Sequence, residues 1–394
     1  MDNFTFYAAK PIEKYHKIDI SLFISMILLW GLGIFTLLIV SQSAGERLFK
    51  DSFYFTRRQL ACSLVGFVLF IAFMLLDMKV IKKMVPLIVL GSVILCILVF
   101  TPLGIEKNGA RRWIKMPLRF SFQPSELVKF AVILFLANFF EKQSKVELEE
   151  DKTVLPGVIG LMFFVGLVFL QKDFSTGVFI ALIGILIFFI SGEKLKWMVP
   201  FAFIAIPTII LMICLEQYRM ERLIGFFRPN EFASDVNYQM RNSKIAISAG
   251  GFFGNGIGKG LFRINSIPEV QADYIFAGWA EAMGFVGVIL YLFLLGFFAW
   301  RGYRTAFKCP SRFSAYASFG CVSVIFLQSL VNCMVVCGLL PSTGIPLPFF
   351  SLGGSSIIMT MIMCGFILNA SRGEELDEKV NKNDDSNIES LLYI

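Results

Sequence analysis

One acidic residue stands where a reaction at a membrane surface is possible. Asp273 ends the longest polar loop of the chain, 216–273, and directly precedes an apolar run that extends from Tyr274 to Trp300. A carboxylate at the edge of a membrane helix costs free energy unless it is solvated, paired or used in function. Partial burial also makes a carboxylate a better base. We therefore take Asp273 as the candidate catalytic residue, acting on a lipid-linked substrate.

A basic and aromatic trio lies in the loop between the third and fourth apolar runs. Arg111 and Arg112 carry guanidinium groups, which match the oxygens of a diphosphate. Trp113 suits the membrane interface, where its ring can meet a lipid or a sugar. These three residues are candidates for substrate binding. The alternative is that they are interfacial anchors whose long basic side chains extend to water.

An acid and a base, Glu126 and Lys129, lie three residues apart at the start of the fourth apolar run. That spacing places both on one side of a helix, so we expect them to form a pair inside the membrane. Pro124 suits the first turn of this helix, and Glu126 suits its positive dipole end. Two interpretations remain open: a buried salt bridge that joins two spans, or a polar floor under the site. Both can hold.

Two further acids have less certain roles. Asp173 lies in a tight turn between apolar runs, where it is either the N-cap of the next helix or a second acid at a metal or hydroxyl site. Glu281 follows Asp273 by eight residues, which places it about two helical turns deeper on the same face. An acid inside a membrane is a functional candidate by default, and pairing with a neighbouring helix is the alternative.

Two loops have unusual compositions. Segment 341–356 is rich in proline, glycine and serine and carries no charge. Irregular backbone at membrane depth is tolerated only inside protein or along a cavity, so this segment is predicted to line a cavity or groove. Segment 250–260 is rich in glycine, but Lys259 is followed by glycine and no strand precedes it, which excludes a nucleotide loop. A flexible or close-packed loop is predicted there instead.

The elements that must position these residues are apolar helices. Hydrophobic residues make up 56% of the 394 residues, and they occur in long runs. This predicts an all-α, polytopic membrane protein with about ten transmembrane helices and a large extracytoplasmic loop between the seventh and the eighth. The predicted spans are 20–40, 60–76, 84–100, 127–140, 154–170, 176–190, 197–215, 274–300, 313–340 and 350–370.

The charges predict the orientation. Loops 77–83 and 301–312 are basic and are therefore predicted to be cytoplasmic, which with ten spans makes both termini cytoplasmic. The opposite face also carries many arginines and lysines, and an anionic substrate explains them. Residues 1–372 are predicted to form the transmembrane domain. Residues 373–394, with seven acids and two lysines, are predicted to be a disordered cytoplasmic tail.

The composition limits cofactors and partners. The single histidine, His16, lies in the predicted cytoplasmic N-terminal segment, which excludes histidine triads and histidine metal clusters at an outer site. No cofactor is certain. A metal would need oxygen ligands, which suits Mg²⁺ or Mn²⁺, with Asp273 as a possible ligand. The eight cysteines form no CxxC pair and predict no disulfide framework. Basic residues that flank a membrane and face outward argue against a nucleic-acid partner.

At this point the motifs resemble those of a known family. Between about Ile20 and Arg372 the chain is similar to the SEDS proteins (shape, elongation, division and sporulation), which have ten spans. No single motif suffices, but together they are specific. They are GARRW at 109–113, FQPSEL at 122–127, Tyr238-Gln239, AGGFFG at 249–254, Pro268-Glu269 with Asp273, Glu281 with Gly284-Phe285, GLLP at 338–341, and GGSS at 353–356, which includes Ser355.

The resemblance implies an activity. Proteins of this family are peptidoglycan glycosyltransferases that polymerise lipid II into an undecaprenyl-diphosphate-linked glycan on the outer face of the bacterial cytoplasmic membrane. A class B penicillin-binding protein is their crosslinking partner. The family's essential aspartate falls on Asp273, its Glu–Lys pair on Glu126 and Lys129, and a further aspartate on Asp173. Gln239, Glu281 and Ser355 join the candidate substrate-binding residues on the same basis.

The chain departs from the family pattern beside several of these residues. A histidine and a threonine that usually precede the essential acid are absent, so any relay through them is lost. The departures are Gln271 and Ala272 before Asp273, Lys172 in place of proline before Asp173, Ala282 in place of a second glutamate after Glu281, and Leu352 in place of tyrosine before Gly353. They bear on the details of the site and leave the resemblance intact.

The sequence favours one role without excluding others. Residues 218–222 are similar to division-type members, whereas 343–348 are similar to elongation-type members. We favour the division type, at the division site with other divisome membrane proteins as partners. An inverting displacement fits, because an α-linked donor becomes a β-linked glycan. A lipid II flippase or transporter and a recruiting scaffold are the alternatives; polar residues gathered on one face favour catalysis.

Overall fold

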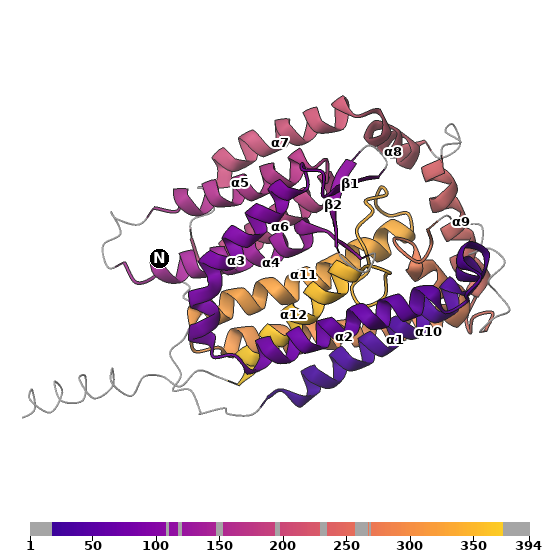
Figure 1. Ribbon diagram of the computed structural model, residues 1–394, viewed down its shortest axis with the longest axis horizontal. Coiled ribbons are helices and arrows are strands. Elements are labelled where there is room, and N and C mark those ends of the chain that lie inside the picture. Colours follow the sequence, from indigo (N-terminus) through magenta and orange to yellow (C-terminus); the bar gives the residue numbers. More distant parts are fainter. Residues whose placement is uncertain are drawn as a thin grey trace, which may run out of the picture.

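The computed structural model describes residues 18–107, 110–116, 120–146, 153–193, 198–228, 235–256, 267 and 269–372. These ranges form a bundle of helices and one small sheet (Figure 1). The helices are α1 (Ile20–Phe49), α2 (Tyr54–Leu75), α3 (Met78–Leu98), α4 (Pro124–Gln143), α5 (Leu155–Leu170), α6 (Phe174–Ile190), α7 (Met198–Leu215), α8 (Gln217–Phe227), α9 (Asp235–Gly250), α10 (Ile275–Lys308), α11 (Arg312–Val336) and α12 (Gly354–Ser371).

The predicted spans coincide with helices. Within the described ranges, six helices are long and apolar enough to cross a membrane, namely α1, α2, α3, α10, α11 and α12. The other predicted spans fall on α4, α5, α6 and α7. As expected, Pro124 begins α4 and Glu126 lies in its first turn. The chain is therefore a helical membrane protein.

The all-α prediction needs one addition. The strands β1 (Gly104–Lys107), β2 (Ala110–Lys115) and β3 (Ser121–Phe122) form an antiparallel sheet in the order β1-β2-β3. The loop 216–273 is also more ordered than expected, since it contains α8 and α9. Short elements of this kind have no long apolar run, which is why the hydropathy pattern does not reveal them.

The helices surround a central pair. Figure 1 shows α11 and α12 in the middle, with α1, α2 and α10 on one side and α3, α4, α5 and α6 on the other. Helix α7 lies at the outer edge. The strands, α8 and α9 gather at one end of the bundle. This end is the one on which the candidate functional residues converge.

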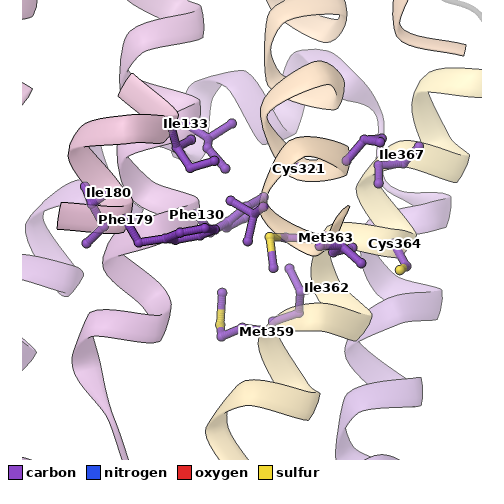
Figure 2. Close-up of a cluster of buried hydrophobic side chains, with 14 of the residues drawn as sticks. Phe130, Ile133, Phe179, Ile180, Cys321, Met359, Ile362, Met363, Cys364 and Ile367 are labelled. Atoms are coloured by element: carbon purple, nitrogen blue, oxygen red, sulfur yellow. The ribbon is translucent and has the colours of Figure 1, made fainter. Parts of the chain in front are cut away.

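Apolar packing fixes the centre of the bundle. Figure 2 shows a cluster of buried side chains from four helices, including Phe130 of α4, Phe179 of α6, Cys321 of α11 and Met363 of α12. Nearly all of α12 is buried, because it lies between α2 and α11. In a membrane the lipid is as apolar as these side chains, so close packing, and not removal from water, supplies the stabilisation.

Helix α10 is broken where a glycine turn docks against it. Gly284 has a φ of 65°, a left-handed conformation that favours glycine. The break frees main-chain groups, and the turn after α9 binds them: Asn255 N–H donates to Glu281 O (3.0 Å), and Phe285 N–H donates to Gly251 O (2.9 Å). The described part of segment 250–260 is therefore close-packed, one of the two predicted alternatives.

Some predictions fall on residues outside the described ranges. These are His16, the acidic tail 373–394, and residues 257–260 of the glycine-rich segment. All eight cysteines are described, and each has a free thiol.

Candidate active site

A cavity of about 840 Å³ opens at the end of the bundle that carries the sheet and α8. Its wall combines segments that are far apart in the sequence: the end of α1, the start of α2, strand β2, the starts of α6 and α12, helix α8, and the chain before α10. Asp273, Arg112, Trp113 and Ser355 all line it. The predicted catalytic residue and part of the predicted substrate-binding set therefore face one space.

Asp273 lies in a turn and not in a helix. Ala272 N–H donates to Glu269 O (2.8 Å), and α10 begins only at Ile275. The Asp273 main-chain oxygen accepts a hydrogen bond from Asn332 Nδ2 (2.8 Å) of α11. Asp273 is half-buried, and a Cβ atom placed on Gly344 would lie 3.5 Å from its Oδ2. The carboxylate therefore lies beside segment 341–356, which does line the cavity as predicted.

The two arginines of the trio separate. Arg112 and Trp113 line the cavity. Arg111 is exposed, is not among the lining residues, and pairs with Glu106 of β1 (3.1 Å). Trp113 pairs with Ile105 and Arg111 pairs with Glu106, so the register skips Arg112 and the regular alternation of faces is interrupted there. The structure thus leaves Arg112, and not Arg111, in a position to meet a ligand in this cavity.

Asp173 organises Arg112. It occupies the N-cap position of α6, but its side chain makes no capping hydrogen bond. Its Oδ2 instead accepts from Gln123 Nε2 (2.9 Å) and from Ser125 Oγ–H (2.9 Å). Its Oδ1 lies 3.9 Å from Arg112 Nη1, while Arg112 Nη2 donates to Lys172 O (2.5 Å). Asp173 therefore takes the predicted N-cap position without capping through its side chain, and its carboxylate supports the site through Arg112.

Glu126 and Lys129 form the predicted pair. Their Oε2 and Nζ atoms lie 2.8 Å apart, and each residue is only 3% exposed. Lys129 Nζ also donates to Gln328 Oε1 (2.7 Å) of α11, and Gln328 Nε2 donates to Pro346 O (2.9 Å). Pro346 lines the cavity, whereas neither member of the pair does. The pair thus joins α4 to α11 and supports the cavity wall from below.

Glu281 and Gln239 lie outside the cavity wall as it is described. Glu281 is 1% exposed within α10, and Gln239 is half-buried on α9. Neither is among the lining residues. The expected common face of Asp273 and Glu281 is wrong because Asp273 precedes the helix, so helical periodicity does not relate the two.

Sequence reasoning does not single out Arg47, Arg58 or Gln59, whereas Arg222 belongs to the basic residues of the outer face for which an anionic substrate is expected. Arg47 lies in the last turn of α1, Arg58 and Gln59 belong to α2, and Arg222 belongs to α8. Arg222 Nη1 donates to Ser342 O (3.2 Å), and the Arg58 guanidinium lies 5.7 Å from the centre of the Phe120 ring. The signal that could have found Arg47 and Arg58 is the basic charge around the loop between the first two spans. Basic residues on the outer face run against the positive-inside rule and therefore call for an explanation.

The electrostatics of the cavity favour an anion. Four arginines line it: Arg47, Arg58, Arg112 and Arg222. The first turn of α12 also faces it, and no acidic residue lies in that turn. Unsatisfied N–H groups and the helix dipole make such a terminus a binding site for phosphate. Against these stand the carboxylates of Glu269 and Asp273.

The geometry defines a class of protein: a helical membrane protein with an arginine-lined cavity at one end and an acid in its wall. The chain belongs to the FtsW/RodA/SpoVE family of cell cycle proteins, whose model matches residues 20–376. It is 32% identical over 363 residues to a protein of Geobacter sp. (strain M18) named probable peptidoglycan glycosyltransferase FtsW, covering 92% of this chain and 98% of that one. It is 33% identical over 356 residues to stage V sporulation protein E of Bacillus subtilis (strain 168), covering 90% and 97%.

Solved structures share the fold. One chain, from work on the structural coordination of polymerization and crosslinking by a peptidoglycan synthase complex, matches with a TM-score of 0.74 and 26% identity, covering 90% of this chain and 98% of that one. The rod shape determining protein RodA of Thermus thermophilus matches with a TM-score of 0.66 and 24% identity, covering 91% and 98%. The second likeness concerns the fold alone.

Proposed function

We propose that this protein is a peptidoglycan glycosyltransferase that polymerises lipid II. One observation carries the proposal: Asp273 lies in the same cavity as four arginines and the first turn of α12. Such a cavity suits a substrate that combines a hydroxyl to be deprotonated with a diphosphate to be expelled. Relatives named probable peptidoglycan glycosyltransferase support the same activity.

The proposed step is a single inverting displacement. The acceptor sugar hydroxyl attacks the anomeric carbon of the donor, and the bond from that carbon to the diphosphate oxygen breaks. The hydroxyl proton passes to a carboxylate oxygen of Asp273, and the electron pair of the broken bond leaves with the lipid diphosphate. General-base assistance of this kind contributes roughly 10²–10⁴-fold to the rate.

The cationic residues of the wall serve the leaving group. Arg112 is held in place by Asp173 and by Lys172 O, and Arg222 is held by Ser342 O. Fixed guanidinium groups stabilise developing negative charge without reorganising during the reaction. Trp113 offers an apolar surface on which the sugar or the lipid can rest.

A divalent cation could bind in this cavity only with few ligands from the described part of the protein. The described residues contain no group of three or more histidine, cysteine, aspartate or glutamate side chains suited to a metal. Mg²⁺ often binds through one or two carboxylates together with substrate phosphates. Asp273 is the residue that would hold Mg²⁺ or Mn²⁺ in that way, and the ion would neutralise the diphosphate.

The proposed activity implies a cellular location. We place the cavity on the outer face of the bacterial cytoplasmic membrane, with ten spans and both termini in the cytoplasm. A class B penicillin-binding protein is the proposed partner, because a structural neighbour comes from a complex that couples polymerization to crosslinking. Other divisome membrane proteins complete the assembly.

A role in division is favoured over one in elongation. Relatives named FtsW are 30–33% identical over most of the chain, whereas the RodA structure is 24% identical. We therefore propose septal synthesis at the division site, with an elongation-type polymerase as the second candidate. Depletion of the protein separates the two: filamentous cells support the division role, and round cells support elongation.

Purified protein with lipid II tests the activity directly. Glycan strands would be resolved on a gel, with moenomycin present to silence other polymerases. Strands that depend on the protein support the proposal. A protein that makes no strands, with or without its partner, but moves fluorescent lipid II across vesicles would instead be a flippase.

A further inference from the structure

A single buried amide clamps one wall of the cavity. Gln59 of α2 is 1% exposed and lies at the cavity end of the helix. Its Nε2 donates to Ser351 O (3.1 Å), and its Oε1 accepts from Gly353 N–H (3.2 Å). Both the donor and the acceptor of the side chain are therefore used on the main chain of one short segment, 351–353, just before α12.

The clamped segment touches the loop that carries Asp273. Leu352 lies between the two residues that Gln59 binds, and its N–H donates to Gln271 O (2.8 Å). Gln271 precedes Asp273 by two residues. A continuous chain of hydrogen bonds thus runs from α2 through the wall segment to the turn beside the acid.

A second set of hydrogen bonds holds the Asp273 turn from α11. Asn332 Nδ2 of α11 donates both to Asp273 O (2.8 Å) and to Ile345 O (2.9 Å). Because Asp273 lies in a turn, no helical hydrogen-bond ladder fixes it. Its place therefore depends on contacts with neighbours, directly from α11 and indirectly from α2.

We propose that Gln59 is a positioning residue that holds the turn around Asp273 through segment 351–353. The inference rests on the proposed function in so far as Asp273 acts on substrate. Since both amide atoms of Gln59 bind main-chain groups of the wall, loss of Gln59 should slow the chemical step more than it weakens substrate binding. A displacement of about 1 Å at a reacting group can cost on the order of 100-fold in rate.

A matched control exists at the opposite end of the same interface. Asn369 of α12 donates through Nδ2 to Phe73 O (2.7 Å) and to Leu76 O (2.5 Å), at the end of α2 away from the cavity. Gln59→Leu and Asn369→Leu each remove an amide that makes two hydrogen bonds between α2 and the region of α12. They differ in whether the bonded segment touches the Asp273 turn.

The test compares glycan synthesis by the two variants in full-length protein, together with their melting temperatures. We expect Gln59→Leu to lower kcat by roughly 10- to 100-fold with KM for lipid II within about threefold of wild type. Asn369→Leu, at a similar loss of melting temperature, should keep kcat within about twofold. Equal loss of kcat in both variants, or a rise in KM alone for Gln59→Leu, would overturn the proposal.

Hydrogen exchange supplies a readout that does not depend on activity. Peptides that cover 269–274 and 347–353 should exchange faster in Gln59→Leu and remain unchanged in Asn369→Leu. Unchanged exchange in both variants would contradict the positioning role. If wild-type protein makes no glycan, the proposed function fails, while the exchange result still decides whether Gln59 holds the turn.

A second variant covers the case in which Gln59→Leu does not fold. Gln59→Glu keeps the shape and can still accept from Gly353 N–H, but its carboxylate cannot donate to Ser351 O. We expect the same faster exchange at 347–353 and the same loss of kcat relative to wild type, with the difference in exchange from wild type relieved at low pH, where a protonated carboxyl group can donate again. Wild-type exchange and kcat across the pH range would overturn the proposal.

Discussion

The centre of the helix bundle and its cavity end are held together by different means. Around the buried cluster of Figure 2, α4, α6, α11 and α12 meet through apolar side chains such as Phe130 and Met363. At the cavity end, irregular segments are fixed by side chains that bind main-chain groups, as Gln328 does to Pro346 and Asn332 does to Ile345.

Because the two regions are held together differently, substitutions in the core and in the cavity wall should have different effects on stability and on activity. Apolar packing is spread over many contacts, so one substitution in the core lowers stability and leaves the geometry of the cavity largely intact. The cavity wall depends on a few hydrogen bonds, each of which fixes a particular segment. A substitution there should change activity more than it changes the melting temperature. The predictions below test this contrast.

The largest expected effect belongs to the acid in the wall. Asp273→Asn keeps the size of the side chain but removes the base, so glycan synthesis should fall by at least about 10²–10⁴-fold. The melting temperature should change little, because the substitution keeps the size of the side chain and the main-chain oxygen that accepts from Asn332 Nδ2. Strand synthesis on a gel and thermal unfolding measure the two quantities. Near-normal synthesis by the variant would remove Asp273 from the proposed mechanism.

The buried ion pair of Glu126 and Lys129 should not follow this division, because it lies among the packed helices and also supports the cavity wall. Its loss should lower both stability and activity. Glu126→Ala or Lys129→Ala leaves a charge in a low-dielectric place, at a cost of about 3–5 kcal/mol in stability. The charge swap, Glu126→Lys with Lys129→Glu, restores a pair but moves each charge relative to Gln328.

Two results of the swap and one of the single variants are informative. Recovery of both melting temperature and glycan synthesis would show a purely structural pair. Recovery of the melting temperature without synthesis would show that the position of each charge matters to the site. Single variants with unchanged stability and activity would rule out both roles.

A substitution in the packed core gives the opposite pattern. Phe130 is fully buried and its ring meets those of Phe73 and Phe366. Phe130→Ala should lower stability by about 3 kcal/mol through the lost packing. At a temperature where the variant is folded, its kcat should stay close to that of wild type. A loss of kcat in fully folded protein would show that the core transmits its packing to the cavity.

The sequence predicts this molecule well where periodicity and charge are strong. Long apolar runs place the helices, and the spacing of Glu126 and Lys129 predicts their pair, because both follow from helix geometry alone. The composition of 341–356 predicts a cavity wall because irregular backbone needs shelter at membrane depth.

Prediction fails where tertiary contacts decide. The separation of Arg111 from Arg112 depends on a strand that no apolar run signals. Helix spacing predicts a shared face for Glu281 and Asp273, but α10 starts after Asp273. Gln59 has no local signal at all, because its partners lie about 290 residues further along the chain.

The smallest effects should separate two neighbouring arginines. Arg112 is held by Asp173 and Lys172 O at the cavity wall, whereas Arg111 pairs with Glu106 on the exposed side of the sheet. An exposed ion pair contributes about 0–1 kcal/mol, so Arg111→Ala should leave stability and KM nearly unchanged. A hydrogen bond to a charged group contributes about 1.5–3 kcal/mol, so Arg112→Ala should raise KM for lipid II or lower kcat by roughly 10- to 100-fold.

The pair of variants is its own control, since each removes the same side chain from the same strand. Kinetics with lipid II and thermal unfolding of both variants complete the measurement. Equal effects of the two substitutions would mean that the sheet acts on substrate as a whole, through its net charge. A larger effect of Arg111→Ala would mean that substrate approaches from the exposed face of the sheet. It would contradict the proposal that the diphosphate binds in the cavity.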